Sequence, residues 1–191
     1  MSTSLWNPRP VRFLEGERLY LRPISQEDVD GYYHMLFNKE MRRLTGTRQI
    51  FTIEGIRRYI EDRSTDSSSV LLLIALQDTD QVIGDIALQD IDSVNRNAGM
   101  RIAIDSEQHL GKGYGPEAMK LLLEYGFGQL NLHRVELQVF DFNERAIKAY
   151  EKVGFVREGV QRDVLYYNHR YHNAILMSVL EHEFREKQMH G

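Results

Sequence analysis

The chain has 191 residues, a length typical of one domain of roughly 100–200 residues, and its 42% hydrophobic and 27% charged residues are ordinary for a globular protein. It contains no cysteine, which excludes disulfides, thiolate metal sites and a cysteine nucleophile. A net charge of -4 at pH 7 argues against a protein that binds nucleic acid by neutralising phosphates.

The sequence carries no membrane or secretion signal. No segment reaches the roughly 20 apolar residues that a membrane span needs, and residues 1–12 lack the apolar run of a secretory signal. We therefore expect a cytoplasmic protein with no membrane partner. The expected organisation is an N-terminal arm over residues 1–16 with one aromatic anchor, Trp6, a single domain over residues 17–182 and a C-terminal tail over residues 183–191.

The first elements are a strand and two helices. The strand is predicted over residues 18–22. Ser25 and Asp28 form a variant of the capping box, which predicts the start of the first helix. Thr52 is the predicted N-cap of the second helix, because apolar residues follow it at helical spacing. Residues 44–49, between the helices, are expected to form a loop.

Three strands are predicted next, over residues 70–76, 82–91 and 100–104. The first two are apolar runs joined by the turn signal Asp78-Thr79-Asp80. Residues 93–97 supply a second turn, after which apolar and other residues alternate as in a half-buried strand.

The most regular helix begins at Gly115-Pro116, because proline suits the first turn of a helix. After it come four elements in order: a strand over residues 134–140, a helix from its cap Asn143 to its stop Gly154, and strands over residues 155–166 and 171–180. The order β-α-α-β-β-β-α-β-α-β-β predicts an α/β (α+β) domain with a mixed sheet of about seven strands.

The segment before that helix contains three glycines at alternate positions: Gly111, Gly113 and Gly115. Glycine allows positive φ and close backbone approach, and a helix start offers free N–H groups with partial positive charge. Together these features indicate a cradle for a phosphate or diphosphate. The spacing differs from the dinucleotide fingerprint and from the Walker loop. A plain glycine-rich turn and a different phosphate-ligand enzyme remain alternative interpretations.

A second motif follows one strand later: Asn143, Ala146, Tyr150, Gly154 and Phe155. With Gln108, Gly111 and Gly113 before it, the chain resembles the GNAT superfamily of acetyltransferases. Their pattern is Gln/Arg-x-x-Gly-x-Gly/Ala, a strand, and Asn-x-x-Ala-x-x-x-Tyr-x-x-x-Gly-Phe. Residues 131–134 and 171–173 resemble the branch of ribosomal-protein N-terminal acetyltransferases and spermidine N-acetyltransferases.

This resemblance implies an N-acetyltransferase that uses acetyl-CoA as its donor. It also implies a mostly antiparallel sheet whose fourth and fifth strands splay apart, so that the pantetheine arm pairs with one strand in the gap. The diphosphate would bind the amides of residues 110–115. The residues expected to bind acetyl-CoA are Ile102, Ala103, Ile104, Gln108, Leu110, Gly111, Lys112, Gly113, Tyr114, Gly115, Asn143, Ala146 and Tyr150.

Three of these side chains have a second interpretation. Asn143 is equally a helix cap, and Lys112 is equally a solvated charge. Tyr150 is the predicted catalytic residue, the acid that protonates the leaving thiolate, and its alternative role is that of a core aromatic.

The sequence marks no general base. Relatives often carry Glu after an Ala at the start of the fourth strand, but here Gly99 follows Ala98. Asp85 on the predicted third strand and Asp92 beyond it are the substitutes that can be named for a base, and the sequence favours a solvated charge over a base for each. A water chain or capture of the neutral amine would also serve.

The first expectation for the acceptor is the N-terminal α-amine of a protein. A polyamine such as spermidine is the alternative, with Glu27, Asp28 and Asp30 as acidic residues that would line its slot. A non-catalytic module that binds acetyl-CoA is the alternative of another class. No metal is expected, because the histidines near the C-terminus lack further ligands. Edge strands near the C-terminus would suit a homodimer.

Overall fold

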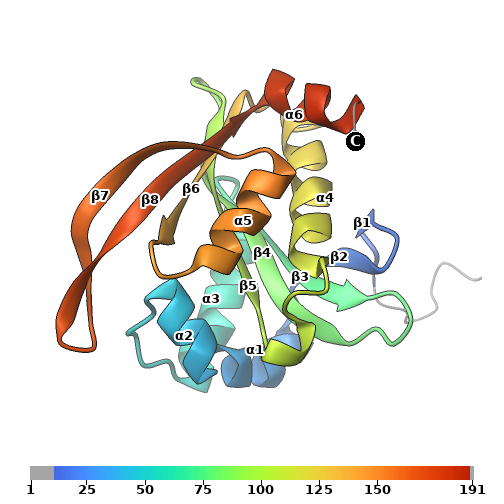
Figure 1. Ribbon diagram of the computed structural model, residues 1–191. Helices are drawn as coiled ribbons and strands as arrows, with labels where there is room; N and C mark the ends of the chain where they lie inside the picture. The colour runs from blue at the N-terminus through green and yellow to red at the C-terminus, as the bar shows by residue number, and fades with distance from the viewer. Residues whose placement is uncertain (1–10, 190–191) are drawn as a thin grey trace, which may run out of the picture.

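One open sheet of eight strands organises the computed structural model, which describes residues 11–189 (Figure 1). The strand order is β1-β2-β3-β4-β5-β6-β8-β7. Neighbouring strands are antiparallel except β5 and β6, which are parallel. The strands are β1 Leu14–Glu15, β2 Leu19–Pro23, β3 Val70–Leu76, β4 Val82–Asp92, β5 Asn97–Ile104, β6 Arg134–Phe140, β7 Val156–Tyr167 and β8 Arg170–Leu180.

Helices cover both faces of this sheet. The α-helices are α1 Val29–Leu36, α2 Lys39–Thr45, α3 Ile53–Thr65, α4 Tyr114–Gly128, α5 Glu144–Val153 and α6 Glu181–Met189, and the 3-10 helices are η1 Gln26–Asp28 and η2 Glu107–His109. Leu72 and Ile74 of β3 pack into the core shared with α4 and α5, whereas Leu73 packs under α1 and α3. Because successive side chains of a strand point to opposite faces, a strand covered on both faces is apolar throughout.

The predicted caps are present in the structure. Ser25 and Asp28 form the capping box that begins η1 and leads into α1. The Thr52 hydroxyl accepts a hydrogen bond of 3.0 Å from the Gly55 amide at the start of α3. The predicted α/β (α+β) fold class is confirmed, and so is the splaying of two central strands, which are β5 and β6.

Two α-helices and one strand were not predicted. The helix α2 was not predicted, and its last two residues fall in the loop expected over residues 44–49, which is non-helical only from Gly46 onward. The two-residue strand β1 pairs with β2 inside the expected arm. The helix α6 occupies most of the expected tail, and its Phe184 is buried against Phe127 with ring centroids 5.5 Å apart. Trp6 lies outside the described residues.

The sheet opens between its two parallel strands. β5 pairs with β6 only over the registers Asn97–Arg134, Ala98–Val135 and Gly99–Glu136. β4 remains paired with β5 as far as Ile104. The edge of β5 that faces β6 therefore has unpaired backbone groups beyond Gly99. Within residues 11–189, no helix is both long and apolar enough to cross a membrane.

Candidate active site

The gap between β5 and β6 leads into a large cleft with a volume of about 940 Å³. The glycine-rich segment and α5 line one part of it, and α1, α2 and α3 line another. Of the residues expected to bind acetyl-CoA, the cleft is lined by Ile102, Ala103, Ile104, Leu110, Gly111, Gly113, Tyr114, Gly115, Asn143, Ala146 and Tyr150. Two residues of that expected set, Gln108 on η2 and Lys112, are not among the lining residues.

The glycine-rich segment turns sharply before α4. Gly111 and Gly113 have φ values of 75° and 85°, a region that residues with a Cβ avoid. The Leu110 amide donates to the carbonyl of Glu107. No acceptor within residues 11–189 binds the amides from Gly111 to Gly115. These amides and the N-terminus of α4 form a site with the chemistry of an anion cradle.

Arg18 supports this segment from the side of β2. Its guanidinium donates a hydrogen bond of 2.7 Å to the carbonyl oxygen of Lys112 and pairs with Glu117 of α4 at 2.8 Å. It also lies over the ring of Tyr114, 5.1 Å from the centroid. A Cβ on Gly113 would come within 3.1 Å of the guanidinium. Sequence reasoning missed this contact, because Arg18 is distant in the chain and belongs to no motif.

The N-terminus of α5 contributes Asn143 and Ala146 to the cleft. The Asn143 side-chain oxygen accepts a hydrogen bond of 3.2 Å from the Ala146 amide, so it caps α5. Its side-chain NH₂ group makes no hydrogen bond within the described part of the chain. The two roles predicted for Asn143 therefore use different atoms of one side chain and are compatible.

Tyr150 lies about two turns beyond Asn143 along α5. Its side chain is buried among apolar residues, and its ring meets Phe155 edge-on with centroids 5.8 Å apart. The hydroxyl has no hydrogen-bond partner among residues 11–189, although the residue lines the cleft. Burial raises the pKa of Tyr150 to about 12. The phenol therefore stays protonated at neutral pH and can act as a donor in the cleft.

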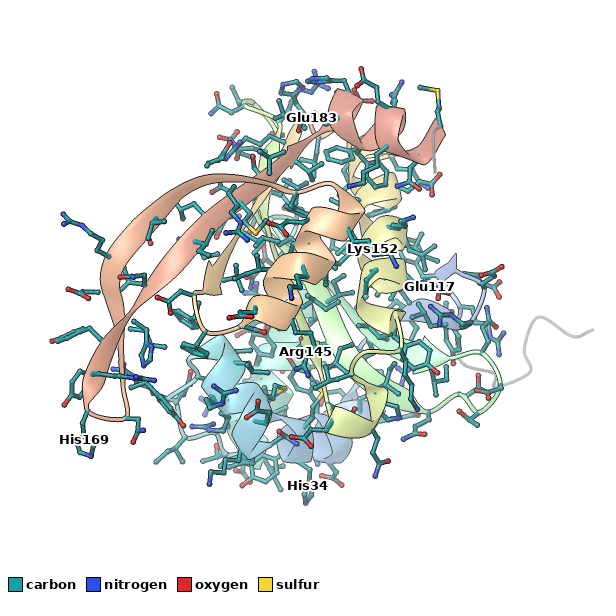
Figure 2. All side chains as sticks on the ribbon, viewed as in Figure 1. His34, Glu117, Arg145, Lys152, His169 and Glu183 are labelled. Carbon is teal, nitrogen blue, oxygen red and sulfur yellow. The ribbon has the colours of Figure 1, made fainter. Side chains whose placement is uncertain are left out.

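α5 also presents cations to the cleft. Arg145, Lys148 and Lys152 all line it, and Figure 2 shows Arg145 and Lys152 at opposite ends of the helix. Their spacing of three and four residues places them along one side of α5. Sequence reasoning did not select them, although this spacing is a signal that could have been used. The arrangement suits an anionic ligand that extends along α5.

The other side of the cleft carries a hydrogen-bonded ion pair. Arg101 of β5 pairs with Asp85 of β4 at 2.6 Å, and the Tyr32 hydroxyl donates to the same Asp85 oxygen at 3.1 Å. Tyr32 stacks on Tyr59 with ring centroids 6.4 Å apart. Burial, reinforced by the charge of Asp85, raises the pKa of Tyr32 above its usual value. Burial opposes the charge on Arg101, but the nearby Asp85 raises its pKa overall.

These contacts bear on the predicted bases. Asp85 is 1% exposed, and one of its carboxylate oxygens, Oδ2, already holds both Arg101 and Tyr32. Asp92 does not line the cleft and instead accepts from the Val94 and Asn95 amides in a turn. Neither carboxylate is placed as a free base. Gly99 lies where β5 and β6 part.

The acidic slot expected from the first helix is not found. Glu27, Asp28 and Asp30 are absent from the residues that line the cleft. Asp28 instead pairs with Arg22 at 2.6 Å and closes the capping box. Within residues 11–189, no group of three or more side chains is arranged to hold a metal ion.

Comparisons with known proteins agree with this geometry. The model of the acetyltransferase (GNAT) domain family matches residues 18–156. The uncharacterized N-acetyltransferase p20 of Bacillus licheniformis is 30% identical over 174 residues, which cover 90% of this chain and 97% of p20. Spermidine N(1)-acetyltransferase of Escherichia coli (strain K12) is 32% identical over 169 residues, which cover 86% of this chain and 87% of that protein.

A solved structure has the same fold. The spermidine N-acetyltransferase from Vibrio cholerae, in complex with CoA and spermine, matches with a TM-score of 0.82 and 24% identity. The match covers 87% of this chain and 98% of that one. With the family model spanning most of the chain, these findings show that the protein belongs to the GNAT family and is an acetyl-CoA-dependent N-acetyltransferase.

Proposed function

We propose that the acceptor is the N-terminal α-amine of a peptide or protein. The observation that carries this proposal is the charge on the acceptor side of the cleft. Asp85 is the one carboxylate among the described residues that line the cleft, and Arg101 neutralises it. A polyamine brings several positive charges that need partners on burial, whereas a peptide brings a single reacting amine.

Acetyl-CoA is expected to bind along the line of unpaired backbone groups. The amides from Gly111 to Gly115 would hold the diphosphate at the start of α4. The free edge of β5 beyond Gly99 would pair with the pantetheine amides. Lys148 and Lys152 would supply positive charge to the phosphates. This placement directs the thioester toward Tyr150 and the acceptor side.

Tyr150 is proposed to donate a hydrogen bond to the departing sulfur. A pKa of about 12 lies above that of a thiol, about 8.5, so transfer of the phenolic proton to a free thiolate is uphill by about 5 kcal/mol. Donation alone therefore does not complete the step. The phenol must recover a proton from the attacking nitrogen, which becomes strongly acidic as it forms the new bond. Tyr150 then passes a proton from nitrogen to sulfur.

The remaining requirements are deprotonation of the amine and stabilisation of the oxyanion. Because Asp85 is occupied and Asp92 lies elsewhere, we propose that the neutral form of the amine is captured or that water removes its proton. An unpaired amide of β5 would donate to the oxyanion, a contribution of about 3 kcal/mol by comparison with other oxyanion donors.

A polyamine is the second candidate, supported by the relatives named spermidine N-acetyltransferase. Release of CoA thiol distinguishes the two candidates. We would test a lysine-free peptide, the same peptide with an acetylated N-terminus, and spermidine, each with acetyl-CoA. The proposal expects thiol release only with the free peptide and a single acetyl group on its α-amine by mass spectrometry. Faster turnover of spermidine than of every peptide would contradict it.

A further inference from the structure

A second cavity of about 360 Å³ lies beside α2 and is unusually basic. We call it the basic pocket, and it is lined by Phe37, Lys39, Arg42, Arg43, Gly46, Thr47, Arg48 and Tyr167. Four of these residues are cationic and none is acidic. Figure 1 shows the turn of the β7–β8 hairpin on the same side of the molecule as α2, and Figure 2 labels His169 at that turn.

Only one of the four cations is paired with a carboxylate within the described part of the chain. Arg43 binds both oxygens of Glu40, at 2.9 and 2.7 Å, and these hydrogen bonds lower the pKa of that carboxyl. Arg42 and Arg48 donate instead to the neutral carbonyl oxygens of Leu36 and Tyr166.

The Lys39 side chain has no hydrogen bond or ion pair among residues 11–189. The pocket therefore holds three cations without a counter-charge, in a chain whose net charge is -4. Carbonyl partners fix the direction of the guanidinium groups without neutralising them. This arrangement favours an anionic ligand.

The basic pocket adjoins the acceptor side of the cleft. Thr47 lines both cavities. Met41, Leu44 and Thr45 of the α2 segment line the cleft, whereas Lys39, Arg42 and Arg43 line the pocket. A polypeptide that leaves the cleft past α2 would therefore reach the pocket within a few residues, since an extended chain advances about 3.3 Å per residue.

From these observations, and resting on the proposed peptide acceptor, we propose that the basic pocket binds acidic side chains of the acceptor that follow its N-terminus. Guanidinium groups pair with carboxylates through parallel N–H donors. The aromatic rings of Phe37 and Tyr167 give the pocket apolar walls for the stems of those side chains. A nucleic acid fits less well, because it is bound along an extended basic stripe rather than in one small pocket.

The test compares acceptor peptides that differ only in the position of two glutamates. One series places the pair progressively further from the free N-terminus, and the reference peptide carries glutamines. At low salt, the peptide whose two glutamates are best placed is expected to have a KM about tenfold lower than that of the reference peptide. Several partly exposed ion pairs, each weak alone, would together give an effect of this size. The advantage should shrink in high salt.

Lys39→Gln/Arg48→Gln removes two unpaired charges of the pocket. This variant should have equal KM values for the acidic and the reference peptide, with kcat for the reference peptide unchanged. The matched control is Arg57→Gln/Arg58→Gln, which removes two exposed charges of α3 that line neither cavity. The control should keep the tenfold preference.

A binding experiment separates this proposal from the proposed function. A fluorescent acidic peptide with an acetylated N-terminus cannot be a substrate, and its Kd is read by anisotropy. Binding that weakens in Lys39→Gln/Arg48→Gln but not in the control supports the pocket, even if no peptide is turned over. Equal binding of the acidic and glutamine peptides would overturn it, as would an oligoribonucleotide that binds more tightly through the same two residues.

Discussion

The guanidinium of Arg18 donates to the carbonyl oxygen of Lys112 across 2.7 Å, although 94 residues separate them in the chain. A carbonyl held on one side of a turn leaves the neighbouring amides free to face the other side. The glycine-rich segment therefore owes its shape both to its own positive φ angles and to Arg18, the residue just before β2.

Arg18→Gln should weaken acetyl-CoA binding. The variant loses the hydrogen bond to Lys112 and the ion pair with Glu117, and a charge-assisted contact of this kind is worth about 1.5–3 kcal/mol. We expect Kd for acetyl-CoA, measured by calorimetry, to rise about tenfold. Arg12→Gln is the control, because Arg12 pairs with Asp80 away from the cleft. Equal effects of the two substitutions would contradict the supporting role.

Tyr150→Phe should lower kcat and leave the KM for acetyl-CoA nearly unchanged. The substitution keeps the ring that packs on Phe155 and removes only the donor, and loss of such a group typically costs about 10²–10⁴-fold in rate. Thiol release measures both constants. Tyr125→Phe on α4 is the control, since Tyr125 does not line the cleft and packs on Phe13. A Tyr150→Phe enzyme with full kcat would exclude proton transfer by the phenol.

The pH profile should report the acceptor amine. Without a base in the cleft, kcat/KM should rise tenfold per pH unit until the amine is neutral, and then level off near pH 8 for an α-amine with a pKa of about 7.7–8.0. Burial raises the pKa of Tyr150 to about 12, so the phenol stays protonated over the measured range. The plot of kcat/KM against pH should therefore show no descending limb up to pH 10. A bell-shaped profile, in which kcat/KM falls again below pH 10, would indicate that a group other than Tyr150 is the acid.

Asp85→Asn should act mainly on stability. The substitution leaves Arg101 without its counter-charge in the cleft. Breaking a fully buried pair from one side costs about 3–5 kcal/mol, and we expect a smaller loss here because 33% of the Arg101 side chain is exposed. Denaturant unfolding should show this loss, with Asp92→Asn as a control that loses only hydrogen bonds to a turn. If Asp85→Asn kept full stability and lost all turnover, Asp85 would be the base after all.

The sequence predicted those elements whose signals are local. Capping residues such as Ser25, Thr52 and Asn143 marked helix starts correctly, and alternating or apolar runs marked the strands. The helix α2 was missed because its residues are mostly polar, so no apolar period marks it. The strand β1 has two residues and is too short to show alternation.

The cleft could be predicted only in part. The glycine segment and the start of α5 carry a pattern that the sequence displays directly. The pairing of Asp85 with Arg101 depends on the register between β4 and β5, which places Asp85 opposite Ala103 and diagonal to Arg101. No spacing along the chain reveals that register, so the sequence could name Asp85 but not its partner.

The proposed mechanism depends on the path of acetyl-CoA through the gap between β5 and β6. The most direct measurement is a crystal structure of the protein with bound CoA. We predict the diphosphate on the amides from Gly111 to Gly115 and the sulfur within hydrogen-bonding distance of the Tyr150 hydroxyl. A diphosphate bound elsewhere, or a sulfur that the phenol cannot reach, would contradict this mechanism.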